Sequence, residues 1–165
     1  MLEIEIKTLD LSHLQDFRAI RLSALEKSPK MFGSTFALEA VKPYSFFEAC
    51  LSYSTVFGVY HKNHIIGLAT VTQETAPKLS HKAVLSSVYI EPEFQQKGVA
   101  SQLMDAVITF SKKHVEQLVL SVADDNQAAI RLYKKFGFQS YGIETNALKE
   151  NDEYVDEMLM KLFLN

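Results

Sequence analysis

Apolar and polar positions alternate at the start of the chain and then change to helical spacing. The alternation over residues 2–7 predicts a strand with one solvent-facing side. Asp10 or Ser12 can cap the helix that follows, and Pro29 ends it. Between residues 31 and 51 a glycine, a proline and several aromatic residues interrupt the pattern, which predicts one or two short helices joined by loops.

Three β-rich runs come next. Residues 55–60 and 64–72 flank Lys62-Asn63, and this arrangement predicts a hairpin. A third run covers residues 83–90. The polar connector 91–98 then leads through a glycine into a helix with one apolar stripe, so a strand passes to a helix at this point.

The C-terminal part repeats the change from strand to helix. A short buried strand is predicted over 118–122 and a helix over 126–136, which Gly137 ends in a left-handed conformation. Two more strands are predicted over 138–143 and 154–164. The chain of 165 residues has no repeat, linker or low-complexity tract, so we expect one domain over residues 1–165 with a mixed α/β (α+β) fold and helices on both faces of a sheet.

Composition narrows the classes of function. Hydrophobic residues make up 47% of the chain and the formal net charge is −3, which favours a folded core and argues against a nucleic-acid partner. No apolar run approaches the roughly 18 residues of a membrane span, and the first ten residues do not resemble a leader. For this reason we predict no membrane partner. The lone Cys50 agrees with a reducing, cytoplasmic location and cannot by itself build a zinc site, so we also predict no metal site.

Three features carry candidate chemistry. The turn from Gln95 to Ser101 opens a helix, where free main-chain N–H groups bind anions such as a diphosphate; alternatively, Gly98 merely eases a tight turn. Asn126 either caps its helix or contacts a ligand. Tyr133 either belongs to the core or donates a proton to a leaving thiolate, because its ordinary pKa is about 10.

These features together resemble the GNAT superfamily of N-acetyltransferases over most of the chain. Residues 87–100 are similar to its strand-loop-helix motif, ending in Gln95-x-x-Gly98-x-Ala100, although the family often has Arg at the first of these positions and Gly at the last. Residues 122–138 are similar to its second motif, Asn-x-x-Ala-x-x-x-Tyr-x-x-x-Gly-Phe. Residues 21–25, with a proline and a phenylalanine after them, resemble the helix that begins many small members.

The resemblance implies a mostly antiparallel sheet of six or seven strands, splayed near its centre, with about four helices. It also implies direct transfer of an acetyl group from acetyl-CoA to a primary amine of a small molecule or peptide, with Tyr133 as the general acid. The residues that would hold the coenzyme are Val88, Ile90, Gln95, Gln96, Lys97, Gly98, Val99, Ala100, Ser101, Asn126, Ala129 and Tyr133.

The general base is not evident from the sequence. Glu91 is the first candidate, directly or through water, followed by His81 and Glu144, and each has a solvated surface role as its alternative. Cys50 lies in an aromatic segment where a small buried thiol is a sufficient explanation. Ordinary surface roles are favoured for the remaining histidines, which are His13, His61, His64 and His114.

Two other readings stay open. A protein that binds acyl-CoA as a sensor or scaffold would share the same motifs without catalysis, and a nucleic-acid-binding domain is disfavoured by the charge. The acceptor is expected to be set by three variable segments, 31–51, 73–81 and a loop over 145–153. The apolar C-terminal run could complete the sheet or contact a second subunit, which leaves a homodimer open.

Overall fold

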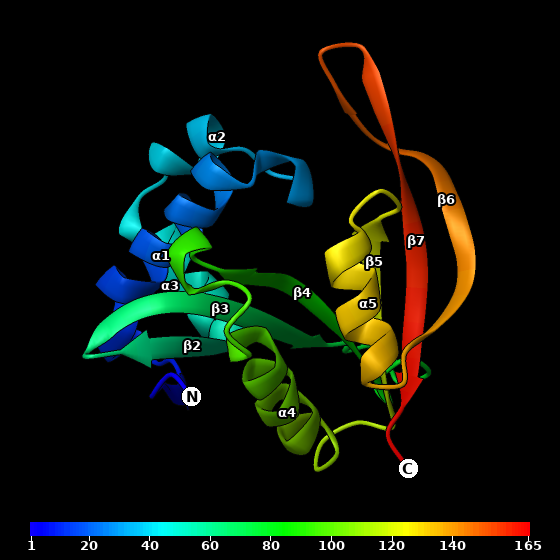
Figure 1. Ribbon diagram of the computed structural model, residues 1–165, viewed down its shortest axis with the longest axis horizontal. Coiled ribbons are helices and arrows are strands. Elements are labelled where there is room, and N and C mark those ends of the chain that lie inside the picture. Colours follow the sequence, from blue (N-terminus) through cyan, green and yellow to red (C-terminus); the bar gives the residue numbers. More distant parts are fainter.

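The computed structural model describes residues 1–165 and contains one sheet of seven strands in the order β1-β2-β3-β4-β5-β7-β6 (Figure 1). The strands are β1 (Glu5–Thr8), β2 (Thr55–His61), β3 (His64–Gln73), β4 (Lys82–Ile90), β5 (Gln117–Ala123), β6 (Gln139–Glu150) and β7 (Glu153–Phe163). The α-helices are α1 (Leu14–Lys27), α2 (Phe36–Ala40), α3 (Tyr44–Tyr53), α4 (Val99–Ser111) and α5 (Gln127–Lys135). Short 3-10 turns are η1 (Leu11–His13), η2 (Pro29–Met31) and η3 (Pro92–Phe94). None of the helices combines the length and the apolarity that a bilayer crossing needs.

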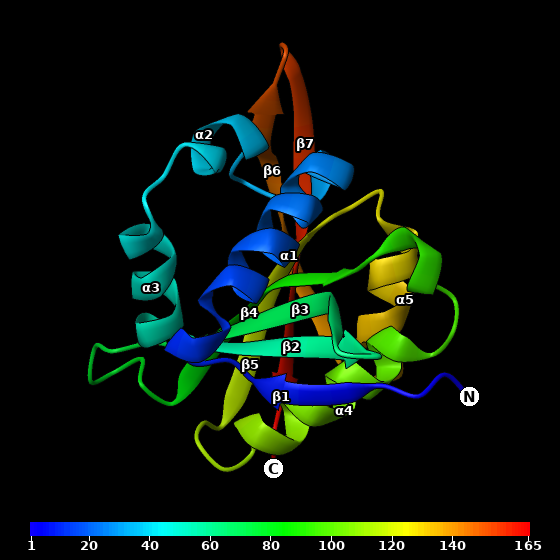
Figure 2. The same cartoon turned by 90° about the vertical axis from the view of Figure 1, so that its left-hand side faces the viewer.

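Helices cover both faces of the sheet, as the sequence predicted. One core packs α1 and α3 against the sheet through fully buried side chains such as Ile20, Leu25 and Phe47. The other core packs α4 and α5 against the opposite face and includes Leu103 and Tyr133. Figure 2 shows α1 and α3 side by side over β2, β3 and β4. The central strands are therefore buried on both sides, which explains their nearly continuous apolar sequence.

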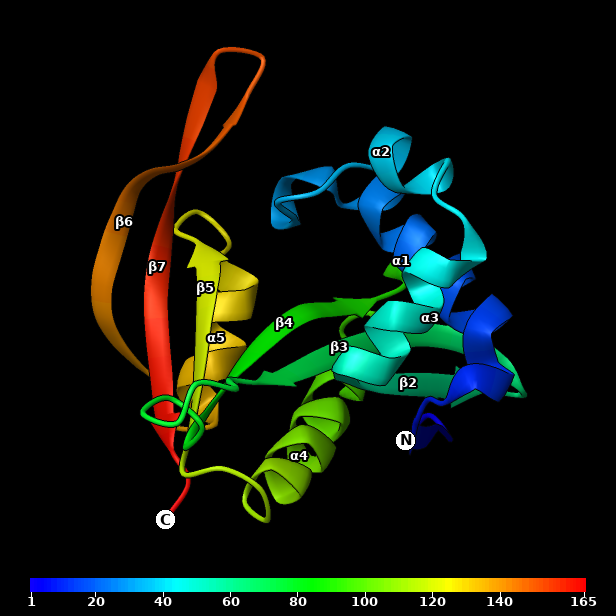
Figure 3. The same cartoon turned by 180° about the vertical axis from the view of Figure 1, so that it is seen from behind.

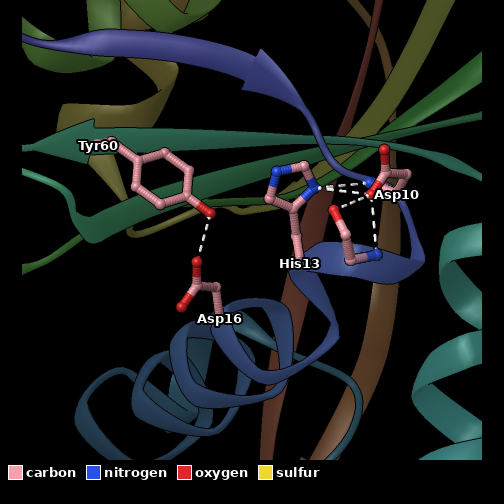
Figure 4. A network of polar contacts seen from close by, with 5 residues as sticks. Asp10, His13, Asp16 and Tyr60 are labelled. Atoms are coloured by element: carbon pink, nitrogen blue, oxygen red, sulfur yellow. Dashed lines mark hydrogen bonds and ion pairs between the residues drawn. The ribbon is translucent and has the colours of Figure 1, made fainter.

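The start of α1 is fixed to the sheet by polar contacts (Figure 4). The Asp10 side chain accepts a hydrogen bond from the Ser12 N–H at 2.8 Å, and His13 Nδ1 accepts one from the Asp10 N–H at 3.0 Å. The Tyr60 hydroxyl on β2 donates to Asp16 at 2.8 Å. Asp10, one of the two predicted caps, thus caps η1, the short turn that leads into α1. The Tyr60 contact holds α1 in place above β2.

β4 and β5 are parallel neighbours for only a short distance. Their register pairs Lys82 with Gln117 and ends with Val84 opposite Val119. Beyond this point the two strands separate, and Figure 3 shows β4 turning away from β5. The predicted splay near the centre of the sheet is confirmed.

A bulge in β4 lies just beyond the point of separation. Leu68 of β3 is opposite Tyr89 and Thr70 is opposite Ser86, so Ser87 and Val88 together face a single residue of β3. Ser87 has a φ of 56°, in the left-handed region. The extra residue bends the strand and re-aims the side chains at this point.

The prediction of a loop over residues 145–153 is wrong. β6 continues to Glu150 and pairs with β7 up to a turn at Asn151 and Asp152, whose φ values are 51° and 62°. The hairpin extends beyond the rest of the sheet (Figure 1). Residues 145–150 are mostly polar or poor strand formers, so their local preference does not favour a strand. Pairing with β7, for example of Leu148 with Val155, gives them the strand conformation.

We expect Gly67 of β3 to be intolerant of alanine. A Cβ at this position would lie 2.6 Å from Cδ1 of Ile90 and 2.8 Å from the carbonyl oxygen of Tyr89, so Gly67→Ala should lower the free energy of unfolding by about 1–3 kcal/mol. Urea denaturation measures this change. Gly142→Ala is the control, because its Cβ would meet nothing nearer than 3.8 Å. Equal stability of the two variants would contradict the close packing of β3 against the end of β4.

Candidate functional site

The separation of β4 and β5 opens a cleft of about 380 Å³, which we call the main cleft. Its walls are the end of β4, the connector that contains η3, the start of α4 and one side of α5. The structure brings together here every residue predicted to hold a coenzyme except Lys97. They are Val88, Ile90, Gln95, Gln96, Gly98, Val99, Ala100, Ser101, Asn126, Ala129 and Tyr133.

The turn into α4 presents a run of free main-chain donors. The N–H groups of residues 96–101 make no hydrogen bond within the chain, and the first helical bond runs from Gln102 N to Gly98 O at 3.2 Å. Gln96 and Gly98 both have positive φ, 59° and 79°, so the chain curls around a concave surface. A Cβ at Gly98 would have nothing within 4 Å, which shows that no side chain fills the turn. Such a cradle of amides at a helix N-terminus binds anions.

Two side chains of the connector have different surroundings. Gln95 Nε2 donates to the carbonyl oxygen of Ile90 at 2.9 Å and so ties the connector back to the end of β4. The Lys97 side chain is exposed and makes no polar contact within the chain. Only the main chain of Lys97 contributes to the run of free amides.

Asn126 fulfils the capping role expected of it. Its Oδ1 accepts a hydrogen bond from the Ala129 N–H at 3.2 Å. Its side-chain NH₂ group donates to no atom of the chain, although the residue lines the main cleft. Asn126 can therefore cap α5 and donate to a ligand at the same time.

Tyr133 extends from α5 toward the opening in the sheet. It is 7% exposed, its ring contacts Phe138 at 5.6 Å between centroids, and its hydroxyl makes no hydrogen bond within the chain. The residue lines the main cleft and also a narrow space of about 50 Å³ between β4 and β5, which we call the strand gap. Burial raises the pKa of the Tyr133 phenol to about 12, so it stays protonated at neutral pH.

Glu91 lies outside the main cleft and contacts α1. Its carboxylate accepts hydrogen bonds from Ser23 at 2.5 Å, Lys27 at 2.8 Å and Tyr89 at 3.0 Å. Burial opposes its ionisation, but these donors outweigh that effect and hold the pKa of Glu91 below its ordinary value of 4.5. The contacts make Glu91 a weak base and a link between α1 and the end of β4.

The positions of the other two candidate bases, His81 and Glu144, follow from the pairing of the strands. The carbonyl of His81 accepts from the Gln117 N–H, so His81 lies at the end where β4 and β5 are still paired, away from the opening. Glu144 on β6 is directly opposite Glu157 on β7. Burial, followed by the charge of Glu144, raises the pKa of Glu157.

Sequence reasoning missed Lys135 and several apolar residues of the cleft. Lys135 Nζ donates to Ser101 Oγ at 3.1 Å and so places a cation beside the free amides of α4. Basic residues are common in the last turn of any helix, so the sequence carried no specific signal for it. The missed lining residues are Met31, Tyr89, Phe94, Ala128 and Leu132.

Comparison with known proteins agrees with this geometry. Residues 20–138 match the model of the acetyltransferase (GNAT) family. The chain belongs to this family. The resemblance drawn from the two motifs is thereby confirmed.

Individual relatives of this GNAT chain are distant. It is 33% identical over 98 residues to the L-amino acid N-acetyltransferase AaaT of Escherichia coli K12, which is 58% of this chain and 60% of that protein. The GNAT-family acetyltransferase of Streptococcus pneumoniae shares its fold with a TM-score of 0.86 and 19% identity over 99% of this chain and 100% of that one. The yncA protein of Salmonella typhimurium, solved with its cofactor acetyl-CoA, has a TM-score of 0.84 and 18% identity over 99% and 95% of the two chains. The predicted fold is confirmed.

We expect the contacts of Glu91 to stabilise this GNAT chain. Glu91→Gln removes a buried charged acceptor and should lower the free energy of unfolding at pH 7 by about 1–3 kcal/mol, the exposed Lys27 contributing little of this. Because the pKa of Glu91 is lowered on folding, its contribution is present above pH 4.5 and fades as the pH falls further. The difference between variant and parent in urea denaturation should therefore shrink below that pH.

The exposed neighbour Glu93 provides the control for this test, since its side chain makes no hydrogen bond. Glu93→Gln should leave the free energy of unfolding unchanged both at pH 7 and below pH 4.5. An unchanged stability of Glu91→Gln at pH 7 would contradict the proposed link.

Proposed function

We propose that this chain is an acetyl-CoA-dependent N-acetyltransferase that passes an acetyl group directly to a primary amine. One observation carries the proposal: the free amides of residues 96–101 open into the same cleft that the Tyr133 residue lines. A turn of unpaired N–H groups and a buried phenol therefore border one cavity, which supports the roles of anion site and proton donor that we propose for them. The acetyl-CoA of the yncA structure and the name of AaaT support the proposal.

The residues of the main cleft fit coenzyme A. The amides of 96–101 would hold its diphosphate without any side chain in the way, and Lys135 would add a positive charge next to Ser101. The main chain of Val88 and Ile90, which line the cleft at the end of β4, would align the pantetheine arm. When bound, acetyl-CoA supplies an acetyl group activated as a thioester.

Tyr133 would act as the general acid. As the amine nitrogen bonds to the acetyl carbon and the carbon–sulfur bond breaks, the Tyr133 hydroxyl donates its proton to the departing sulfur. Water then returns a proton to Tyr133 and accepts the surplus proton of the nitrogen. A phenol with a pKa of about 12 is fully protonated at neutral pH, so the proton is in place before the carbon–sulfur bond breaks.

Direct transfer needs no nucleophile from the protein. Cys50 is partly buried and burial raises the pKa of its thiol, so it remains uncharged. We assign Glu91 a structural role because three donors hold it as a weak base. The amine would instead lose its proton to water.

Tyr133→Phe should lower kcat about 100-fold and leave the affinity for coenzyme A within about twofold, because only the proton donor is lost. Thiol release gives the rate and isothermal titration calorimetry gives the affinity. In the parent enzyme, no loss of activity from ionisation of Tyr133 is expected below about pH 11. Tyr141→Phe, on the exposed face of β6, should leave both quantities unchanged. Equal turnover in Tyr133→Phe across the pH range would remove Tyr133 from the acid role.

Lys135→Ala should weaken coenzyme A binding about tenfold and reduce the dependence of binding on salt, because one positive charge near the diphosphate is lost. Calorimetry at two salt concentrations measures both effects. Lys134→Ala is the matched control, since this neighbouring lysine is exposed and makes no polar contact. If both variants weaken binding equally, the effect is one of overall charge and not of the Lys135 position.

A panel of amines with acetyl-CoA tests the proposed reaction as a whole. An acetyltransferase binds coenzyme A and releases thiol in the presence of at least one amine. A sensor or scaffold would bind coenzyme A and release none. Absence of coenzyme A binding would contradict both functions.

A further inference from the structure

A second cavity, of about 400 Å³, lies between α3 and the sheet, and we call it the aromatic pocket. It is bounded by α1, α2 and α3 on one side and by β2, β3 and β4 on the other. At one end it reaches Ser86 and Ser87 of the β4 bulge. The same two serines line the strand gap, which Tyr133 lines as well. Ser86 and Ser87 are therefore shared by the aromatic pocket and the space that Tyr133 lines.

The walls of the aromatic pocket are largely apolar. Phe46 and Phe47 of α3 stack edge-to-face at 5.1 Å between centroids, and Phe17 of α1 packs against Phe47 at 6.1 Å. Tyr53 and Val56 continue this wall. A pocket of this size and lining has ample room for an aromatic ring, since a dry cavity of about 150 Å³ is enough for benzene.

The charged groups of the aromatic pocket neutralise each other. Arg21 donates to both carboxylate oxygens of Glu39, each at 2.9 Å, and its remaining nitrogen donates to Ser87 Oγ at 2.7 Å. Burial opposes ionisation of Glu39, but the bonds from Arg21 hold its pKa below the ordinary value. The Glu39 carboxylate is thus already paired with Arg21. An ammonium group that entered the pocket would lose its hydration without gaining a free carboxylate as a partner.

From this arrangement we infer that the acceptor is a primary amine that carries an aromatic or large apolar group. The apolar group occupies the aromatic pocket, and the nitrogen lies at the Ser87 end, toward the strand gap and Tyr133. The inference rests on the proposed function and specifies its substrate. Free arylalkylamines, aromatic amino acids and peptides with an aromatic N-terminal residue share this chemistry.

Competing amines test the inference through thiol release and binding. The probes are 2-phenylethylamine, L-phenylalanine, a peptide with N-terminal phenylalanine, and spermidine as the polycationic alternative. We expect kcat/KM for at least one aromatic probe to exceed that for spermidine at least tenfold. The ranking of the three aromatic probes shows whether the acceptor is a free arylalkylamine, an amino acid or a peptide N-terminus. Preference for spermidine would overturn the inference.

A substitution at the rim of the pocket separates its role from that of the main cleft. Ala49 lines the aromatic pocket at an exposed position of α3, so Ala49→Trp should fill the pocket without disturbing the core. It should lower kcat/KM for the aromatic probes about tenfold and weaken calorimetric binding of 2-phenylethylamine, with coenzyme A affinity unchanged. Thr70→Phe, on the β3 wall, fills the pocket from the other side and should give the same result.

The control is Ser52→Trp, an exposed position on the same helix that does not line the pocket. Equal effects of Ala49→Trp and Ser52→Trp, or no effect of either filling variant, would overturn the inference. If no amine releases thiol, the proposed function fails. Binding of 2-phenylethylamine that Ala49→Trp abolishes would still support the pocket in that case.

Discussion

The shortness of the pairing between β4 and β5 is the constraint on which the rest of the structure depends. Three residue pairs join these parallel strands, and beyond Val84 the β5 side of β4 has no strand partner. Main-chain groups left unpaired inside a protein are costly unless water or a ligand satisfies them. The gap between the two strands therefore borders a cleft, and Tyr133 of α5 and Ser87 of β4 both line this gap.

Side-chain contacts of α1 hold the other wall in position. Tyr60 fixes the first turn of the helix, Arg21 contacts the β4 bulge at Ser87, and Glu91 binds the last turn through Ser23 and Lys27. The first and last of these contacts lie at opposite ends of one helix, so α1 cannot tilt without breaking one of them. This rigidity gives the aromatic pocket a definite shape, and a preformed site loses less entropy when a ligand binds.

Most elements could be predicted because their signals are local. Helical spacing indicated α1, α4 and α5, and the bare turn at Gly98 indicated an anion site, which the free amides of 96–101 support. The long β6–β7 hairpin was missed because residues 145–150 do not favour a strand by themselves. The surroundings of Glu91 could not be predicted for a similar reason: its position after β4 suggested chemistry, while its three hydrogen-bond partners include two residues of α1 that are more than 60 positions away.

The sequence by itself determined the order of the elements, since periodicity, caps and glycine positions depend on neighbours along the chain. Its two motifs indicated the family and most of the residues that line the main cleft. Only the tertiary structure decided that Lys135 lies beside Ser101, that Arg21 neutralises Glu39, and that an aromatic pocket meets the strand gap at Ser87. These contacts join side chains distant in sequence, for example Arg21 and Ser87, which are 66 positions apart. No local pattern encodes such distances, because packing of the two cores sets them.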